Sequence, residues 1–278
     1  MNLYLKTAFK TSKLITRSYS TSFSTATRLF DKETRWAIYS VYGFVRFADE
    51  IVDTFHDYNK KYLLEKFEKD YYDALEHGIS LNPVLHSFQK TVKQYNIPDE
   101  HIQAFLKSMK DDLNVTDYNA KSEINEYIYG SADVVGLMCL KVFCNGNEKM
   151  FKDLEVPAMK LGSAFQKVNF LRDLKADLQT LNRKYFPEIE RSGFEEKDKL
   201  LIITDIENDF NEAFKGIKKL PKRSKLAVLI AYYYYKILLR KIKNTPAKKV
   251  IQTRIRVSNP KKLLLILKAI FVYKLKLI

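Results

Sequence analysis

The sequence is poor in the residues that break helices or cross-link a chain. It has 8 Gly and 7 Pro among 278 residues, so long stretches run without a helix-breaking residue. Its two cysteines, Cys139 and Cys144, form no CxxC and no zinc-ligand pattern, which indicates a reduced, cytosolic chain. Strand-like alternation is scarce, and no apolar run reaches the ~20 residues that span a bilayer. These absences predict one all-α domain over residues 1–278.

The charge balance restricts the partners. Lys and Arg number 48 against 33 Asp and Glu, a formal net charge of +15. Such an excess favours anionic partners, which include nucleic acid, a membrane surface and phosphorylated small molecules. Composition alone does not choose among them, although 46% hydrophobic residues exclude a disordered chain.

Two acidic pairs with the same spacing lie in segments of helical periodicity. "RFADEIVDTF" contains Asp49 and Asp53, and "NFLRDLKADL" contains Asn169, Asp173 and Asp177. Like charges four residues apart destabilise a helix by a few tenths of a kcal/mol, and carboxylates in apolar helices are costly unless paired or bound to a cation. Two facing pairs are therefore suited to hold Mg²⁺ against a diphosphate, because Mg²⁺ prefers carboxylate oxygens and bridges to phosphates.

Arginine accompanies each acidic pair. Arg46 lies one turn before Asp49, and Arg172 adjoins Asp173, so each arginine is placed to bind phosphate oxygens or to pair with a carboxylate. The alternative is that each motif is a salt-bridged helix surface, but the occurrence of both motifs with their arginines argues against it. The 18 Phe and 18 Tyr are interpreted first as core and second as the lining of a carbocation cavity.

The apolar periodicity predicts a series of long helices. Their ranges are 32–54, 59–77, 81–95, 99–114, 147–182, 197–217 and 222–243. The segment 124–143 is predicted as two helical pieces with a bend or close approach at Gly130 and Gly136, and 147–182 as a helix or helix pair interrupted near Pro157.

Several blocks resemble the squalene/phytoene synthase family. The opening block is "SYSTSFSTATRLFDKETRWAIYSVYGFVRFADEIVD", the middle motif is "YIYGSADVVGLMC", and the second acidic block is "LGSAFQKVNFLRDLKADLQTLNRKYFP". "YKILLRKI" and "TRIRVS" resemble the closing segment. The motifs follow family order over roughly residues 15–260, and their amino-acid sequences resemble those of bacterial phytoene synthases most closely. The resemblance implies a single-domain isoprenoid-synthase helical fold with a central cavity.

The resemblance also implies roles for individual residues. The expected catalytic residues are Asp49, Asp53, Asp173, Asp177 and Tyr127, and the expected metal ligands are Asp49, Asp53, Asn169, Asp173 and Asp177. The expected substrate-binding residues are Ser20, Ser22, Phe23, Arg46, Gln166, Asn169, Arg172, Tyr185, Tyr235 and Arg254. Asp133 and Lys167 depart from the family pattern, and two roles stay open for Asp133: a buried partner of Lys167 or a polar group at the site.

The implied activity is head-to-head condensation of two geranylgeranyl diphosphates to phytoene, through a cyclopropylcarbinyl (prephytoene) diphosphate, in carotenoid biosynthesis. The implied cofactor is Mg²⁺ (or Mn²⁺), and NADPH is not expected because no G-x-G-x-x-G follows a strand. The alternatives are a squalene- or dehydrosqualene-type synthase using farnesyl diphosphate, a terpene cyclase, and a non-enzymatic basic protein on membrane or RNA. The expected partners are prenyl diphosphates and downstream carotenoid enzymes, without nucleic acid.

The two ends of the sequence carry their own expectations. The basic, acid-free N-terminus is open between an organellar targeting peptide and a structural segment, and residues 1–14 between flexible and ordered. Residues 259–278 are expected to form a basic amphipathic helix that lies in a lipid interface. The predicted location is cytoplasmic, peripheral to the inner face of the membrane, although packing of this tail on the protein's own core is the alternative.

Overall fold

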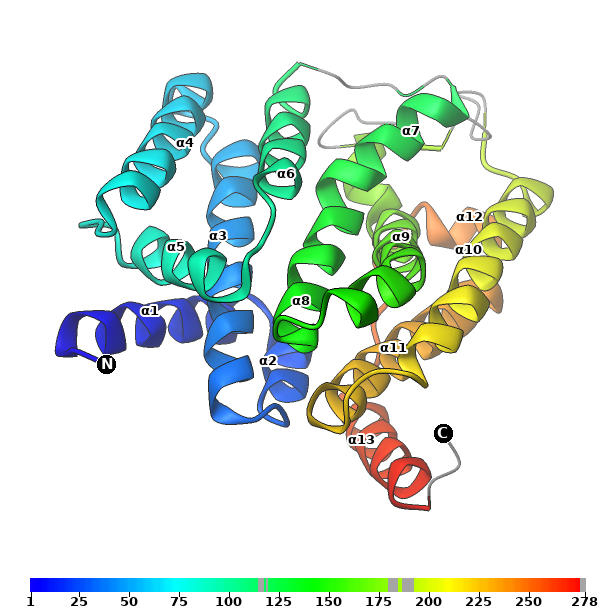
Figure 1. Cartoon of the computed structure of the whole chain (residues 1–278). Helices are drawn as coiled ribbons and strands as arrows, with labels where there is room; N and C mark the ends of the chain where they lie inside the picture. Colours follow the sequence, from blue (N-terminus) through cyan, green and yellow to red (C-terminus); the bar gives the residue numbers. More distant parts are fainter. Residues whose placement is uncertain (115–117, 119, 180–184, 187–192, 276–278) are drawn as a thin grey trace.

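Helices make up most of the described chain (Figure 1). The computed structural model describes residues 1–114, 118, 120–179, 185–186 and 193–275, without the side chains of 177–179, 259, 261, 263 and 274. Within these ranges no β-strand occurs. The predicted all-α fold class is therefore confirmed.

The connections between most of the described helices are short. They are α1 (Leu3–Tyr19), α2 (Thr21–Thr27), α3 (Lys32–Thr54), α4 (Lys60–His77), α5 (Pro83–Tyr95), α6 (Asp99–Asp111), α7 (Lys121–Ile128), the π-helix η1 (Tyr129–Asp133), α8 (Val134–Cys144), α9 (Glu148–Gln179), α10 (Glu196–Ile217), α11 (Lys222–Lys243), α12 (Ala247–Val250) and α13 (Asn259–Lys274).

Local sequence signals set several helix boundaries. The Asp31 carboxylate caps α3 by accepting hydrogen bonds from the backbone N–H groups of Glu33 and Thr34, both at 3.0 Å. Gly78 ends α4 with a left-handed φ of 71°, which costs glycine little because it has no Cβ. These residues explain why the predicted limits of 32–54 and 59–77 lie so close to the observed ones.

The helices surround a central cavity rather than one solid core. α9 packs against α8 and α10, and α3 packs against α1 and α5. In Figure 1 the blue α1 and the red α13 lie on opposite sides of the molecule. The solid part of the core includes Phe44 of α3, whose ring stacks on Phe88 of α5 with centroids 4.0 Å apart. This core holds α3 in place as one wall of the cavity.

The predicted interruption near Pro157 is wrong, because α9 continues through this residue as one helix of 32 residues. Proline in a helix interior removes a hydrogen bond and clashes with the preceding turn. The cost is offset here by close packing on α10. A Cβ added to Gly216 would lie 2.3 Å from the Pro157 Cβ, so the glycine makes room for the ring.

The predicted bend in 124–143 appears as the π-helical turn η1 between α7 and α8. Gly130 lies in this turn, and a Cβ on it would come within 2.7 Å of the Ala104 carbonyl oxygen. From the other side, Gly162 of α9 approaches the Ala132 carbonyl oxygen, which a Cβ would meet at 2.8 Å. The turn is thus held between α6 and α9 by two glycine contacts.

One continuous helical run among the described residues, Lys121–Cys144, has the length and apolar composition of a membrane span. It comprises α7, η1 and α8, and 61% of its most apolar window is buried inside the protein. Several of its residues line the central cavity. Core helices have the same composition, so this run is accounted for by the fold.

Candidate active site

A cavity of about 750 Å³ lies between α2, α3, η1, α8, α9, α10 and α11. Its lining changes in character along its length. On α3 the lining residues run from Ile38 and Val41 to Asp49 and Asp53. On α9 they run in the same way, from Leu154, Ala158 and Leu161 to Asn169 and Asp173. The cavity therefore has an apolar end and a charged end.

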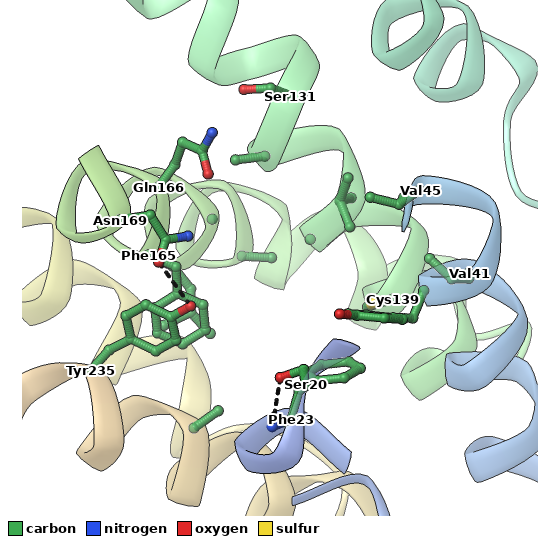
Figure 2. Close-up of a pocket in the computed structure, with 18 of the residues that line it drawn as sticks. Ser20, Phe23, Val41, Val45, Ser131, Cys139, Phe165, Gln166, Asn169 and Tyr235 are labelled. Atoms are coloured by element: carbon green, nitrogen blue, oxygen red, sulfur yellow. Dashed lines mark hydrogen bonds between the residues drawn. The ribbon is translucent and has the colours of Figure 1, made fainter. Parts of the chain in front are cut away.

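The charged end brings the two acidic motifs to one space. Asp49 and Asp53 come from α3, and Asp173 comes from α9. Figure 2 shows Val41 and Val45 of α3 facing Gln166 and Asn169 of α9 across the cavity. The side chain of Asp177 lies outside the described residues.

Arginines surround the carboxylates of this end. The Arg46 guanidinium forms an ion pair with Glu50, lies 4.0 Å from Asp49, and stacks over the Tyr19 ring at 4.4 Å. On the other wall, Arg172 Nε donates to both oxygens of Asp173 at 3.1 Å.

Arg254 reaches the same carboxylate from the segment after α12, with 2.7 Å between its Nε and Asp173 Oδ1. A diphosphate in this space would offer all three guanidiniums competing acceptor oxygens.

The acidic motif on α3 stands in an electrostatically unfavourable place. Burial, with a further contribution from the neighbouring Asp53, raises the pKa of Asp49 to about 7. Asp112, at the end of α6, also lines the cavity and raises this pKa further. Removal from water and the neighbouring carboxylates both disfavour the charged form of Asp49, and a cation bound beside it would offset both effects. The donor set is therefore complementary to a bound cation.

The described side chains do not form a ready-made metal cage. Among them no group of three or more His, Cys, Asp and Glu lies close enough to hold one ion. Mg²⁺ is commonly bound by only one or two carboxylates, with waters and substrate phosphates completing its octahedron. Carboxylates on two walls of one cavity fit ions that are shared with a diphosphate between them.

Aromatic residues form one side of the charged end. The rings of Tyr127, Phe170 and Tyr185 stack on one another, and Phe170 and Tyr185 have centroids 4.0 Å apart. Tyr127 Oη donates a hydrogen bond to Asp112 Oδ2 at 2.8 Å. Burial, and secondly the Asp112 carboxylate, raise the pKa of the Tyr127 phenol well above its usual value. Tyr127 is therefore a neutral phenol whose proton is directed at a carboxylate.

A second aromatic pair lies between α9 and α11. The rings of Phe165 and Tyr235 stack with centroids 4.0 Å apart, and Tyr235 Oη donates to Asn169 Oδ1 at 3.2 Å (Figure 2). The hydrogen bond fixes the Asn169 amide at the border between the two ends of the cavity. The "YYYY" segment thus places Tyr235, its last tyrosine, at the site.

The apolar end is lined by side chains from several elements. Its lining comprises Ala26, Phe30, Phe143, Leu154, Ile217, Leu220, Ala227 and Val228. Phe30 and Phe143 are in ring contact, with centroids 5.3 Å apart. Such a lining suits long hydrocarbon chains and excludes water from them.

The two departures from the family pattern have partners in α10 and α9. Lys167 pairs with Asp205 and with Asp209, the latter at 2.6 Å, so the proposed pairing with Asp133 is not what the structure shows. Asp133 accepts a hydrogen bond from Ser163 Oγ at 2.8 Å. Burial raises the pKa of Asp133 to about 7. Both residues therefore connect helices behind the cavity wall.

Most of the residues singled out from the sequence line the cavity. They are Ser20, Phe23, Arg46, Asp49, Asp53, Tyr127, Gln166, Asn169, Arg172, Asp173, Tyr185, Tyr235 and Arg254. Ser22 is not among the lining residues, whereas Ser20, just before α2, and Phe23, in its first turn, line the cavity. Ser20 Oγ also caps α2 by accepting the Phe23 N–H at 3.2 Å.

Several residues that line the charged end were not predicted as site residues, and three of them bear on its chemistry. They are Tyr19, Tyr42 and Asp112. Tyr42 lies one turn before Arg46 on α3 and stacks on Phe23 at 4.9 Å, so the helical spacing already carried its signal. Asp112 had only the pair "DD" at the end of a predicted helix, and nothing in that pattern showed which aspartate faces inward.

The profile of the squalene/phytoene synthase family matches residues 16–199. Phytoene synthase 1, chloroplastic, of Zea mays is 28% identical over 264 residues, which cover 86% of this chain and 62% of that protein. Phytoene synthase 2, chloroplastic, of Solanum lycopersicum is 27% identical over 264 residues, covering 88% and 84%. The chain thus spans less than two thirds of the maize relative.

Solved structures share the fold. A dehydrosqualene synthase in complex with ligand superposes with a TM-score of 0.82 at 22% identity, covering 97% of this chain and 98% of that one. The squalene synthase HpnC from Alicyclobacillus acidocaldarius superposes with a TM-score of 0.76 at 21% identity, covering 87% and 95%. At these identities the likeness supports the fold and not a particular reaction.

Proposed function

This chain belongs to the squalene/phytoene synthase family, whose members are prenyltransferase-type synthases, and on that basis we propose that it condenses two geranylgeranyl diphosphates head to head into phytoene. The reaction passes through prephytoene diphosphate and releases two diphosphates. The observation that carries the proposal is the cavity with carboxylates and arginines at one end and an apolar lining at the other. This polarity matches a substrate with an anionic head and a long hydrocarbon tail.

The charged end binds and orients the diphosphate heads. Arg46, Arg172 and Arg254 supply guanidinium donors, which suit phosphate oxygens because of their planar, multidentate geometry. The residues that would hold Mg²⁺ or Mn²⁺ are Asp49, Asp53, Asn169, Asp173 and Asp177. When bound, the metal ions supply Lewis-acid stabilisation of the charge that develops on the leaving diphosphate.

The remainder of the cavity protects the carbocations. The apolar lining keeps water from the ionised substrate, which prevents premature capture as an alcohol. The faces of Tyr127, Phe165, Tyr185 and Tyr235 contribute negative ring potential, which attracts a cation within about 6 Å. The second substrate's double bond then attacks the first cation, and loss of a proton from the carbon that carried the first cation closes the cyclopropyl ring. A second ionisation and rearrangement follow.

The final step is loss of a proton, for which this chain offers a hydroxyl relay. The Tyr127 phenol donates to Asp112, so an outgoing proton taken by the tyrosine oxygen can be balanced by transfer of the phenolic proton to the carboxylate. Released diphosphate or a cavity water are the competing bases. No hydride donor is required by this ending, and we propose that NADPH takes no part.

The test is a product analysis. Purified protein is incubated with Mg²⁺ and either geranylgeranyl or farnesyl diphosphate, with and without NADPH, and the hydrocarbons are separated by chromatography. The proposal expects a forty-carbon triene-bearing product that NADPH does not change. A thirty-carbon product preferred from farnesyl diphosphate would instead establish a squalene- or dehydrosqualene-type synthase. A reduced product formed only with NADPH, or prephytoene diphosphate accumulating without it, would contradict the proposal.

A further inference from the structure

The C-terminal helix α13 has two apolar faces, and one of them packs on α11. Leu265 and Ala269 are buried in this contact. Tyr273 Oη donates to the Lys222 carbonyl oxygen at 3.3 Å, and Lys268 Nζ lies 5.4 Å from the Tyr233 ring centroid. Lys262 Nζ, near the start of α13, lies 5.8 Å from the Tyr234 ring centroid. The helix therefore runs antiparallel to α11 and contacts it near both of its ends. Packing of this tail on the protein, one of the two expectations, accounts for this face only.

The second face has no covering element among the described residues. Leu264, Leu267, Phe271 and Leu275 are exposed by 67%, 56%, 62% and 53%. Their spacing of three, four and four residues places them along one stripe of the helix. Single exposed apolar residues are ordinary, but four large ones in a continuous stripe mark an interaction surface.

The surroundings of this stripe are strongly basic. Residues 213–278 contain 19 of the 48 Lys and Arg and none of the 33 Asp and Glu. The first 212 residues hold 29 basic against 33 acidic residues and are net negative, so the whole positive excess lies in the last quarter of the sequence. Exposed Lys218, Lys219 and Lys222 sit at the α10–α11 turn, beside the end of α13 that contacts Lys222. The stripe thus has a cationic border.

The same region lies behind the apolar end of the cavity. Ala227, Val228 and Ala231 of α11 line the cavity, while Tyr233 and Tyr234 of α11 meet the lysines of α13. One helix therefore separates the hydrocarbon end of the cavity from the exposed stripe. In Figure 1, α13 projects from the body of the molecule next to α11.

We propose that the outer stripe of α13, with the lysines of the α10–α11 turn, is a docking surface for an anionic lipid bilayer. Apolar side chains flanked by lysines match the two layers of a bilayer surface, acyl chains below and anionic headgroups above. A nucleic acid would leave the leucines and the phenylalanine exposed. A second copy of this chain would bring two basic borders together. Charge complementarity therefore favours the bilayer.

Docking also positions the product end, a consequence that rests on the proposed function. A forty-carbon hydrocarbon has no favourable aqueous state, so its release is slow unless an apolar phase is near. With α13 on the lipid, α11 lies between the apolar end of the cavity and the bilayer, so a hydrocarbon released beside α11 has a short path into the lipid. Anionic vesicles are then expected to speed multiple turnovers by increasing product release.

The docking test is vesicle flotation with matched variants of the full chain. One triple variant carries Leu264→Gln, Leu267→Gln and Phe271→Gln. Its control carries Leu14→Gln, Leu81→Gln and Leu201→Gln, which remove leucines of similar or greater exposure from α1, the α4–α5 connection and α10. The probes are vesicles of phosphatidylcholine alone and vesicles that also contain phosphatidylglycerol.

The basic border is tested separately. Lys218→Glu, Lys219→Glu and Lys222→Glu are compared with Lys61→Glu, Lys69→Glu and Lys93→Glu, which are exposed residues of α4 and α5. Figure 1 shows these two helices on the side of the molecule opposite to α13. The control has the same change in net charge, so it separates a local border from the overall charge of the protein.

The expected result is that wild type and both controls float with anionic vesicles, and that each docking variant binds at least tenfold more weakly. Recovery of a docking variant equal to that of wild type would overturn the proposal. So would equal recovery of wild type on neutral vesicles, or a wild-type dimer that dissociates in the leucine variant without any vesicle binding. Unchanged circular dichroism and thermal unfolding establish that α13 still folds.

The release arm uses phytoene formation. Anionic vesicles should increase the steady-state rate of wild type and not of the docking variants, while the rate of the first turnover stays the same in all of them. Equal stimulation of the docking variants would contradict the release route. Absence of any phytoene would contradict the proposed function, and flotation would still decide the docking surface.

Discussion

Neutralising Asp173 should separate the catalytic role of the charged end from its contribution to folding. We expect Asp173→Asn to remove most of the activity and to leave the fold almost as stable. The same outcome is expected for Asp49→Asn on the opposite wall. The prediction follows from the contacts of Asp173, whose carboxylate accepts from Arg172 at 3.1 Å and lies 2.7 Å from Arg254 Nε.

The expected loss of stability is smaller than the expected loss of activity, because the two losses arise in different environments. The side chains of Asp173 and Arg254 are 23% and 53% exposed, and ion pairs of this exposure contribute up to about 1 kcal/mol. A loss of that size lowers the Tm of a chain this long by about 2–4 °C. In the reaction, losing even one preorganised neutral donor costs about 10²–10³ in rate, or about 2.7–4 kcal/mol. A carboxylate that holds a cation against the leaving group should cost at least as much.

The assay is diphosphate release from geranylgeranyl diphosphate at several Mg²⁺ concentrations, with thermal unfolding of the same samples. Asp70→Asn is the control, because Asp70 pairs with Lys66 at 2.8 Å on α4, outside the central cavity. An activity of Asp173→Asn within tenfold of wild type, about 1.4 kcal/mol in barrier, would show that the carboxylate is not a metal ligand. A loss of activity matched by unfolding would show that its role is structural.

Three further predictions concern the frame around the site. Lys199 is fully buried and donates to the carbonyl oxygens of Lys243 and Thr245 at 3.1 and 2.6 Å. Lys199→Met should lower the free energy of unfolding by about 1–3 kcal/mol, since it leaves these acceptors without their donor, and denaturant titration measures this loss. Gly162→Ala should destabilise by about 1–3 kcal/mol and reduce turnover, because its Cβ would meet the Ala132 carbonyl oxygen at 2.8 Å; Gly78→Ala, away from the cavity, is the control for turnover. Burial lowers the pKa of His101 below its usual value of 6.5; Lys141 lowers this pKa further and Glu100 opposes the shift. The unfolded state therefore binds the proton more tightly, and unfolding free energy falls as pH drops below about 6.5; His101→Leu should flatten this acid limb, and an unchanged pH profile of Tm would refute the assignment.

The helices were predictable where local signals and apolar periodicity agreed. The Asp31 cap and the uninterrupted apolar face gave α3 its observed limits, and breaks before Pro83 and Pro98 separated α4, α5 and α6. Pro157 misled because its effect depends on Gly216, which is distant in sequence and close in space. The sequence of α1 does not decide between a structural segment and a targeting peptide, because a basic, hydroxyl-rich composition is typical of both.

The charged end of the site was predictable for a similar reason. Asp49, Asp53 and Arg46 share one face of one helix, so spacing alone places them together. Asn169, Arg172 and Asp173 do the same on α9. Tertiary contacts decided the remainder. Nothing in the sequence indicates that Asp112 receives the Tyr127 hydroxyl, or that Lys167 turns to Asp205 and Asp209 instead of Asp133.

The apolar end shows why chain length is the harder property to infer. A diphosphate is recognised by charge, and charged residues in apolar helices are conspicuous in a sequence because burying them without partners is costly. A hydrocarbon tail is recognised by the volume left between ordinary core residues, here Phe30, Phe143, Leu220 and Val228 from four different parts of the chain. Each of these residues has the identity that any helical core would favour, and only their joint position makes a cavity. Substrate length is therefore set by packing, so exchanging Phe30 or Val228 should change product length with little effect on diphosphate binding.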